Sequence, residues 1–365
     1  MVREGTLRRA VELRYRHDIA PENPQNAGQM RAVLTSAHGG REVLQLARDF
    51  PDPQPAPDEV LLRVAASAVN FHDIFTRRGM PGIRIPLPVI VGSDIAGEIV
   101  ALGAGVSGWQ LGDRVLIDPV FRDGRRTGMI GETTHGGRAE LFAVPAVQLI
   151  TVPASVSLLD AATLPLAYGT AYRMLLTQGR LRRGEKILIL GASGGVGVAC
   201  VQIAKLLGAE VLACTSSPTK VRTLTELGAD HVVDYSKEGF FEAVKRIYGK
   251  PRVTGGGGVD VAVNFTGGDT WRDTQRAVTQ GGRILTCGAT AGFDLLTDAR
   301  YLWTFEHRYI GSNGWEVADL EALLGMIRDG RLKPVIDRVL PLEAAAEGER
   351  LLEDREVIGK VLLKP

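Results

Sequence analysis

A glycine-rich turn between two apolar segments carries the clearest chemical signal in this chain. Lys186-Ile-Leu-Ile-Leu190 is followed by Gly191-Ala-Ser-Gly-Gly-Val-Gly197, and then by the helix-like segment Val198–Leu207. Glycines let such a turn bring backbone N–H groups against a pyrophosphate, and the positive end of the helix dipole attracts the same group. Because the turn lies between a predicted strand and a predicted helix, it indicates a dinucleotide-binding site.

The turn after the next predicted strand favours one dinucleotide over the other. The strand Glu210–Cys214 runs into Thr215-Ser-Ser-Pro-Thr-Lys220, which contains no acidic residue. A carboxylate here would bind the ribose 2′-hydroxyl of NAD, whereas hydroxyl groups and a cation fit the 2′-phosphate of NADP. Ser216, Ser217 and Lys220 therefore predict NADPH as the cofactor. The alternative is that Lys220 is only a solvated lysine at the start of a helix.

The order of the predicted elements around these turns indicates two domains. From Met30 to about Val152, short alternating apolar runs lie between Gly, Pro and Asp residues, which is typical of an antiparallel β domain. From about Pro153 a strand-then-helix order repeats, and this predicts a parallel sheet in an α/β domain. The strands of that sheet are expected at Lys186–Leu190, Glu210–Cys214, His231–Val233, Val259–Phe265 and Arg283–Cys287.

The C-terminal part of the chain is expected to return to the β domain. After Gly311 the pattern predicts a helix over Asp319–Asp329 and two strands around Arg338 and Lys360. We therefore assign residues 30–152 and 312–365 to the β domain, and residues 153–311 to the dinucleotide-binding domain. Residues 1–29 are assigned to an N-terminal extension, because they lack the apolar segment of a secretory signal and are too acidic for a transit peptide.

Composition narrows the class of protein. The 365-residue chain has 43 Lys and Arg against 42 Asp and Glu, so it lacks the positive surplus that nucleic acids and anionic membranes attract. Its longest apolar run, Lys186–Val201, is broken by four glycines and is shorter than the roughly 20 residues of a membrane span. Three cysteines are too few for a disulfide scaffold. We therefore expect a cytoplasmic protein of two domains.

Several of these segments together resemble the medium-chain dehydrogenase/reductase superfamily. The resemblance covers Met30–Pro365 and implies a GroES-like β domain packed on a Rossmann domain, with the nicotinamide in the cleft between them. Two further segments are similar to the quinone-oxidoreductase-like branch of the superfamily, namely Asn70-Phe-His-Asp73 with Arg77-Arg-Gly79, and Gly92-Ser-Asp-Ile-Ala-Gly-Glu98. The superfamily segments are Gly191–Gly197, the turn ending at Lys220, Asp234-Tyr235, Asp269-Thr-Trp271 and Gly359-Lys-Val.

Many members of this superfamily hold a catalytic zinc, and the resemblance allows its ligand positions to be compared. Zinc enzymes have Cys where this chain has Asn70, His where it has Ser93, and Cys where it has Leu166. These side chains do not form a zinc site, and Asp118–Glu132, where the structural zinc would be bound, contains no Cys. We therefore expect no metal.

Without a metal, the reaction that we expect is hydride transfer to a small electrophilic acceptor, such as a quinone or the β-carbon of an enone, enal or enoyl thioester.

The resemblance also implies roles for side chains in the cleft. Asn70 is expected to face the nicotinamide and to orient or polarise the substrate. Tyr168 is expected on the segment that passes the nicotinamide. His72 or His135 could supply a proton, although either histidine could instead be merely hydrogen-bonded.

Further residues are expected to support this site. Asp73 and Arg77 should form a charge pair that braces the short helix following Asn70. Cys287 is expected to be a small buried side chain beside the nicotinamide rather than a nucleophile. The predicted cofactor-binding residues are Thr170, Gly191, Ser193, Gly194, Gly195, Val196, Gly197, Thr215, Ser216, Ser217, Lys220, Tyr235, Asn264, Cys287, Gly288, Ala289, Gly311 and Ser312.

Three functions stay open from the sequence. The first is an NADPH-dependent reductase of quinones or activated alkenes. The second is an NADP-linked alcohol dehydrogenase, and the third is a weakly catalytic NADPH-binding protein of the crystallin type. The resemblance also implies a homodimer that pairs through the strand Arg308–Ser312, whose Tyr309 and Ile310 are apolar and which contains no Lys or Pro to block its edge.

Overall fold

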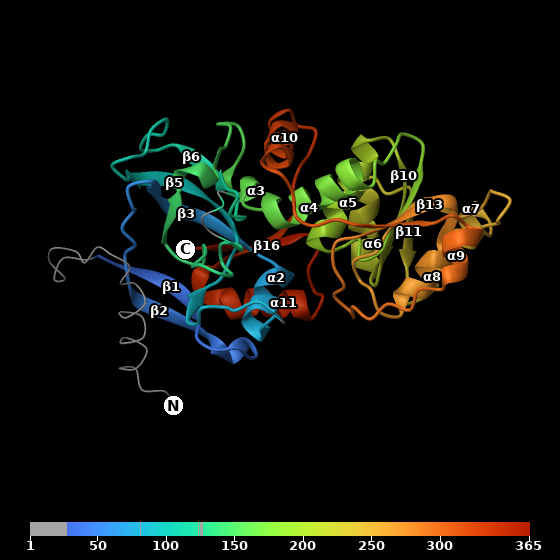
Figure 1. Cartoon of the computed structure of the whole chain (residues 1–365), viewed down its shortest axis with the longest axis horizontal. Coiled ribbons are helices and arrows are strands. Elements are labelled where there is room, and N and C mark those ends of the chain that lie inside the picture. Colours follow the sequence, from blue (N-terminus) through green and yellow to red (C-terminus); the bar gives the residue numbers. More distant parts are fainter. Residues whose placement is uncertain (1–27, 81, 123, 125–126) are drawn as a thin grey trace.

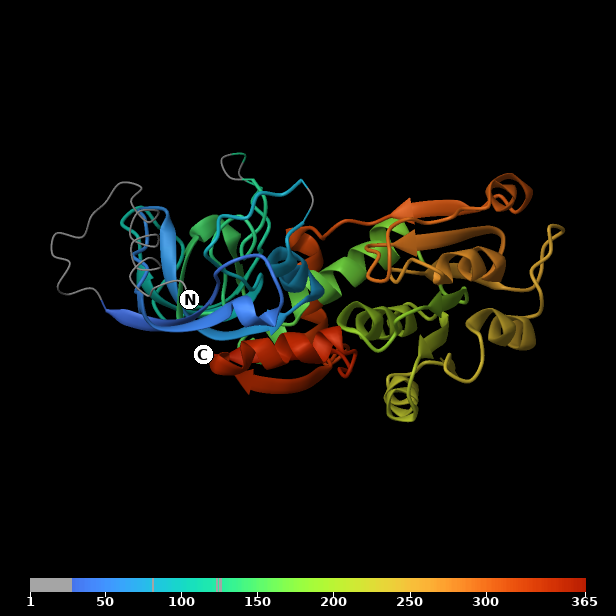
Figure 2. The ribbon, with the colours of Figure 1, turned by 90° about the horizontal axis from the view of Figure 1, so that it is seen from below.

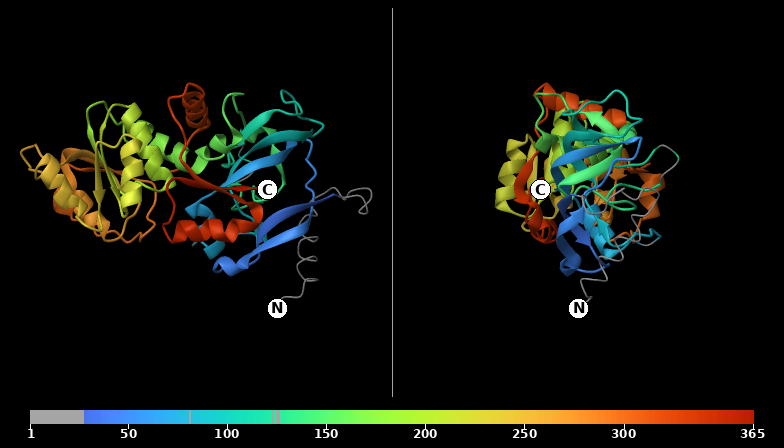
Figure 3. Two further views of the ribbon diagram at one scale, coloured as in Figure 1. Left: turned by 180° about the vertical axis from the view of Figure 1, so that it is seen from behind. Right: turned by 90° about the vertical axis from the view of Figure 1, so that its left-hand side faces the viewer.

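Two lobes built on sheets of different kinds lie side by side along the long axis of the molecule (Figure 1). The computed structural model describes residues 28–80, 82–122, 124 and 127–365. One lobe holds the N-terminal strands together with the C-terminal ones, and the other holds the middle of the chain. The chain therefore leaves the first lobe once and returns to it, and its C-terminus lies in that first lobe (Figure 3).

The middle of the chain forms a Rossmann sheet of six parallel strands in the order β11-β10-β9-β12-β13-β14. Its strands are apolar at successive positions, as expected for a parallel sheet covered on both faces. In β9, Ile187 and Ile189 pack into one core with helix α5 (Gly195–Leu206), while Leu188 packs into another core with α7 (Phe240–Tyr248) and α8 (Thr270–Ala277). The strands are β9 (Lys186–Ile189), β10 (Glu210–Thr215), β11 (His231–Asp234), β12 (Val259–Val263), β13 (Val278–Thr286) and β14 (Arg308–Gly311).

Five helices follow the strands of this sheet. Helices α5 and α6 contribute to the core on one face, and α7 and α8 to the core on the opposite face. The helices are α5 (Gly195–Leu206), α6 (Pro218–Glu226), α7 (Phe240–Tyr248), α8 (Thr270–Ala277) and α9 (Ala299–Thr304).

The other lobe is built on a seven-stranded sheet and a three-stranded sheet, both mostly antiparallel. The C-terminal strand β16 pairs with β3, which places Val361 opposite Val69, so the end of the chain lies in the same sheet as β3. The larger sheet contains β15 (Ile336–Pro341), β16 (Lys360–Lys364), β3 (Glu59–Val69), β5 (Asp94–Leu102), β6 (Arg114–Ile117), β8 (Leu149–Thr151) and β7 (Leu141–Pro145). The smaller sheet contains β2 (Leu44–Pro51), β1 (Gln29–Thr35) and β4 (Val89–Ile90).

A helical segment joins the lobes and runs between them (Figure 2). It consists of α3 (Leu158–Ala161), η3 (Leu164–Gly169), α4 (Thr170–Tyr172) and η4 (Arg173–Gln178), of which η3 and η4 have π-helical hydrogen bonds. Its buried side chains belong to one core that includes Ala66 and Ala96 of the β lobe and Val198 of α5. The remaining helices are α2 (Phe71–Arg78), α10 (Val317–Arg328), α11 (Ala345–Glu353), and the short η1 (Arg41–Val43), η2 (Ala146–Gln148) and η5 (Leu342–Ala344).

The predicted fold class is confirmed: a parallel doubly wound Rossmann domain with a GroES-like, mostly antiparallel domain. Boundaries differ at several elements, since α5 begins at Gly195 rather than Val198, and β13 begins at Val278 rather than Arg283. The predicted extension, residues 1–29, falls almost wholly outside the described residues, and β1 begins at Gln29. No helix in the described part of the chain is long and apolar enough to cross a bilayer.

Candidate functional site

The glycine-rich turn between β9 and α5 has the shape that a pyrophosphate requires. Gly191 has φ +66°, and a Cβ at Gly197 would lie 2.3 Å from the carbonyl oxygen of Gly191, so neither position accepts a side chain without strain. A Cβ at Gly194 would meet nothing closer than 3.6 Å, which leaves that side of the turn open. The first N–H groups of α5 at Gly195 and Val196 have no partners within the helix, so they can bind a phosphate.

The end of β10 offers hydroxyl groups and a cation for a further phosphate. Oγ1 of Thr215 is buried and has no hydrogen-bond partner among the described residues. Ser217 caps α6, and Ser216 before it is exposed. Nζ of Lys220 donates to the carbonyl oxygen of Arg355 at 2.5 Å, and burial lowers the pKa of this lysine. These are the hydroxyl groups and the cation from which the sequence predicts binding of the 2′-phosphate of NADP, and that specificity stays a prediction.

A buried polar cluster connects the phosphate turn to the β lobe. Lys360 donates to Oδ1 of Asn70, and its Nζ lies 3.1 Å from Oδ2 of Asp94. The amide of Asn70 donates to Asp94 at 2.9 Å and to the carbonyl of Ala68 at 3.3 Å. A Cβ at Gly195 would lie 2.9 Å from Cδ of Lys360, so the lysine stem packs directly on the phosphate turn.

This cluster corrects the expected role of Asn70. Both of its amide hydrogens point at acceptors of the protein, and its side chain is only 8% exposed. The geometry therefore leaves no hydrogen of Asn70 for a substrate carbonyl, contrary to the sequence-based expectation. The sequence did not predict a role for Asp94 or Lys360, because these residues lie 24 and 290 positions from Asn70 in the chain.

The two candidate histidines have different surroundings. Nε2 of His72 lies 2.8 Å from Oε2 of Glu132, and the side chains are 27% and 8% exposed. Nδ1 of His135 accepts a hydrogen bond from the backbone N–H of Ile90 at 3.0 Å, and desolvation lowers the pKa of this imidazole to about 4. His135 is therefore neutral near pH 7 and is not suited to donate a proton. Glu132 was missed by sequence reasoning, since it lies 60 positions from its partner.

The structure places Tyr168 away from a catalytic role. Its side chain is fully buried, and its phenol oxygen accepts hydrogen bonds from the N–H of Val335 at 2.9 Å and from Gln202 at 3.2 Å. Desolvation raises the pKa of this phenol above its ordinary value. Tyr168 therefore links η3 to α5 and to the segment before β15, which is a structural function.

Most of the remaining predicted cofactor residues lie where strands of the Rossmann sheet end, whereas Thr170 begins α4. Asn264 is fully buried and holds its own turn, because its Oδ1 accepts from the N–H groups of Thr266 and Gly267. Cys287 follows β13, and desolvation raises its pKa to about 12, which excludes a thiolate near neutral pH. The other positions include the largely buried Thr170, Ser312 with an Oγ that lacks a partner in the described chain, the exposed Tyr235, and Gly288 and Gly311, where an added Cβ would meet nothing within 4 Å.

The positions that correspond to zinc ligands do not fit a metal. The amide of Asn70 is already bound by Lys360 and Asp94, and Leu166 contributes only its backbone N–H, which donates to Asp94 at 2.9 Å. Ser93 is fully buried and offers a neutral hydroxyl. These donors lack the thiolate and imidazole groups that bind zinc. In the described ranges, no group of three or more His, Cys, Asp or Glu residues is arranged to hold a metal ion.

The helix that carries His72 is fixed by a buried ionic network, and here the predicted pairing is wrong. Asp73 does not pair with Arg77: it binds Arg138 at 2.9 Å, while Arg77 binds Glu349 of α11 at 2.6 Å. Arg138 also binds Glu349, so the four charges form one network that connects α2, α11 and the segment before β7. Since all four side chains are fully buried, the network fixes the position of α2.

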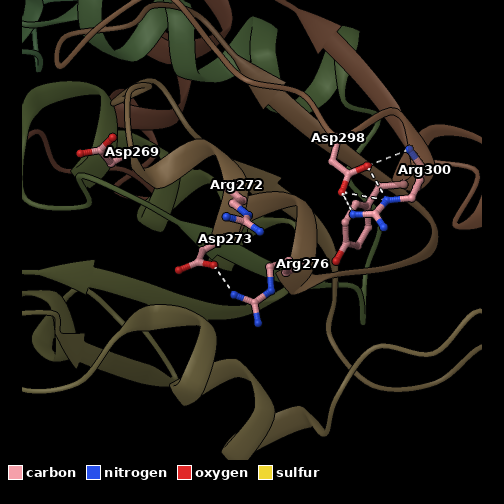
Figure 4. A pocket seen from close by; sticks show the side chains of 7 residues that line it. Asp269, Arg272, Asp273, Arg276, Asp298 and Arg300 are labelled. Atoms are coloured by element: carbon pink, nitrogen blue, oxygen red, sulfur yellow. Dashed lines mark hydrogen bonds and ion pairs between the residues drawn. The ribbon is translucent and has the colours of Figure 1, made fainter.

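A charged hollow of about 450 Å³ lies elsewhere, between α8 and α9 (Figure 4). Its charges are largely paired within it, as in Asp273 with Arg276 and Asp298 with Arg300. It shares no residue with the cluster around Asn70, and its arginines and aspartates balance. It therefore gives no reason to place the chemistry there.

Comparison with known proteins identifies both lobes. Residues 56–154 match the alcohol dehydrogenase GroES-like domain, and residues 195–329 match the zinc-binding dehydrogenase family. An acryloyl-coenzyme A reductase of Sulfurisphaera tokodaii is 30% identical, over 87% of this chain and 95% of that protein. A solved NAD-dependent alcohol dehydrogenase is 38% identical, with a TM-score of 0.85 and coverage of 92% and 100%. The 2-octenoyl-CoA carboxylase reductase CinF, solved with NADP and 2-octenoyl-CoA, is 28% identical, with a TM-score of 0.82 and coverage of 97% and 90%.

Proposed function

We propose that this chain, which belongs to the medium-chain dehydrogenase/reductase superfamily, is an NADPH-dependent reductase of quinones or activated alkenes that uses no catalytic metal. The observation that carries the proposal is the donor set at the zinc positions: Asn70 held by Lys360 and Asp94, the hydroxyl of Ser93, and Leu166. A zinc ion that acts as a Lewis acid stabilises the alkoxide during oxidation of an alcohol, whereas an acceptor that is already polarised does not require one.

Different residues of the chain bind different parts of the cofactor. When bound, NADPH supplies a hydride, which is two electrons and one proton. The N–H groups at the start of α5 hold the pyrophosphate, and Thr215, Ser216 and Lys220 bind the 2′-phosphate. Asn70 contributes as a positioning residue, because it joins Lys360 on the phosphate turn to Asp94 in the β lobe.

Two of the compared proteins support this assignment of cofactor and substrate class. CinF is named as a reductase of an enoyl thioester and was solved with NADP, and the relative from Sulfurisphaera tokodaii is named as a reductase of acryloyl-coenzyme A. Both names describe activated C=C bonds. We further propose a cytoplasmic homodimer that acts on a small electrophilic acceptor.

The second candidate is an alcohol dehydrogenase. It is favoured by the 38% identity to a solved NAD-dependent alcohol dehydrogenase, which exceeds the identity to CinF. The donor set around Asn70 and the acid-free turn at Thr215–Lys220 oppose zinc and NAD respectively.

The proposal is tested by measuring the steady-state rate of NADPH oxidation with each of a panel of acceptors: quinones, enals, enones, crotonyl-CoA and acryloyl-CoA. Metal analysis of the same preparation accompanies the assay. We expect turnover with at least one of these acceptors at a zinc content far below one ion per chain. Turnover that is limited to alcohols or aldehydes and depends on stoichiometric zinc would contradict the proposal.

A further inference from the structure

His72 and Glu132 form a pair that is held in place from both sides. His72 is the second residue of α2, whose position is fixed by the buried network of Asp73 and Arg77. Glu132 lies in a turn that packs closely on the chain after β4, since a Cβ at Gly131 would lie 2.9 Å from backbone atoms of Gly92. The 2.8 Å contact between imidazole and carboxylate therefore joins two closely packed segments.

The burial of the two partners differs in a way that suits proton transfer. The carboxylate of Glu132 is 8% exposed, whereas the imidazole of His72 is 27% exposed and can exchange protons with water. A carboxylate that accepts the proton on one ring nitrogen orients the imidazole and stabilises its cationic form. Within the described residues, the carboxylate of Asp73 also interacts with His72, and it is already paired with Arg138.

The pair also lies at the junction of the lobes. Asn70, two residues before His72, caps α2 and accepts a hydrogen bond from Lys360, whose stem packs on Gly195 of the phosphate turn. Three other titratable groups that the sequence predicts for the site are unsuited to donate a proton near pH 7. His135 is neutral, and the phenol oxygen of Tyr168 is buried and already accepts a hydrogen bond from Val335. The thiol of Cys287, whose pKa is about 12, keeps its proton near neutral pH.

We infer that His72 delivers the proton that completes reduction of the acceptor, and that Glu132 is its positioning residue. The inference rests on the proposed function, which supplies the hydride. With Nε2–H donating to Glu132, the proton on Nδ1 is the one that is transferred. After hydride reaches the β-carbon of an activated alkene, the electron pair at the α-carbon takes this proton: the C–H bond forms as the N–H bond breaks. The neutral imidazole then regains a proton from water.

The test uses the full chain, an activated alkene that the native protein reduces, and D2O as solvent. Glu132→Gln keeps the size of the side chain and removes its charge, and His72→Gln removes the donor. The matched control is Glu210→Gln, because Glu210 faces His231 at 3.3 Å in the Rossmann lobe, away from the junction. NADPH affinity and melting temperature show that each variant is folded.

We expect the native protein to place solvent deuterium on one face of the α-carbon. His72→Gln should lower kcat by about 10²–10⁴-fold, abolish the limb of the pH–rate profile due to the histidine, and give deuterium on both faces. Glu132→Gln should lower kcat by roughly 10-fold, shift that limb and leave NADPH affinity unchanged, while Glu210→Gln behaves like the native protein. Native kcat and single-face labelling in both junction variants would overturn the inference. Absence of turnover with any acceptor in the native protein would overturn the proposed function, and this inference with it.

Discussion

Nζ of Lys220, in the first turn of α6, lies 2.5 Å from the backbone carbonyl oxygen of Arg355, which follows α11 in the other lobe. Lys220, which the sequence predicts to bind the 2′-phosphate, is thus also a contact between the two lobes. Burial lowers the pKa of Lys220, the nearby carboxylate of Asp337 raises it, and the nearby guanidinium of Arg355 lowers it.

We predict that Lys220→Glu weakens NADPH binding by about 10–150-fold, since a charge-assisted hydrogen bond contributes roughly 1.5–3 kcal/mol. The affinity for NADH should change far less. Fluorescence titration with both dinucleotides measures the ratio, and Lys250→Glu, in an exposed position after α7, is the control. Equal affinity of the native protein for NADPH and NADH would refute the assignment of the 2′-phosphate site.

The cluster around Asn70 predicts a stability effect. Asn70→Ala removes an acceptor from the buried ammonium of Lys360 and a donor from Asp94. We expect a loss of about 1–3 kcal/mol in the free energy of unfolding, because buried polar groups are left without partners. Urea denaturation measures it, with the exposed Asn313→Ala as control. An unchanged free energy of unfolding in Asn70→Ala would show that the cluster does not hold the lobes.

Sequence reasoning succeeded where local pattern decides the structure. The turn Gly191–Gly197 and most strand positions could be predicted, because apolar runs and glycines report on the backbone near them. Contacts between distant segments could not, since nothing local to His72 indicates Glu132, and nothing local to Asn70 indicates Lys360. The π-helical turns of η3 had no local signal either, as their residues pack in both lobes.

Burial of His135 predicts a pH dependence of stability. Its pKa is about 4 in the folded protein and about 6.5 in the unfolded chain. Between these values the unfolded chain binds the extra proton, so stability falls as pH falls from about 6.5 toward 4. We expect a loss of about 1–3 kcal/mol, and His135→Asn, which keeps an acceptor for Ile90, should reduce it. Denaturant titrations at pH 5 and pH 7 compare the two proteins; identical pH dependence would contradict the assignment.

The edge of the Rossmann sheet predicts a dimer. Among the described strands, β14 pairs only with β13, so one edge of Arg308–Gly311 is open to a partner strand. Light scattering at micromolar concentration should give twice the mass of one chain. Ile310→Lys should shift the population toward monomer while NADPH still binds. A native protein with the mass of a single chain would refute this pairing.

The position to which hydride is transferred tests the central claim most directly. NADPH deuterated at C4 is oxidised by the chelator-treated protein with an enal, an enone or crotonyl-CoA, and NMR locates the deuterium in the product. A metal-free reductase of activated alkenes places deuterium at the β-carbon and leaves the carbonyl group intact; hydroquinone formation from a quinone under the same conditions is the parallel result. Deuterium at the carbonyl carbon, with activity restored only by added zinc, would contradict the account and identify an alcohol dehydrogenase.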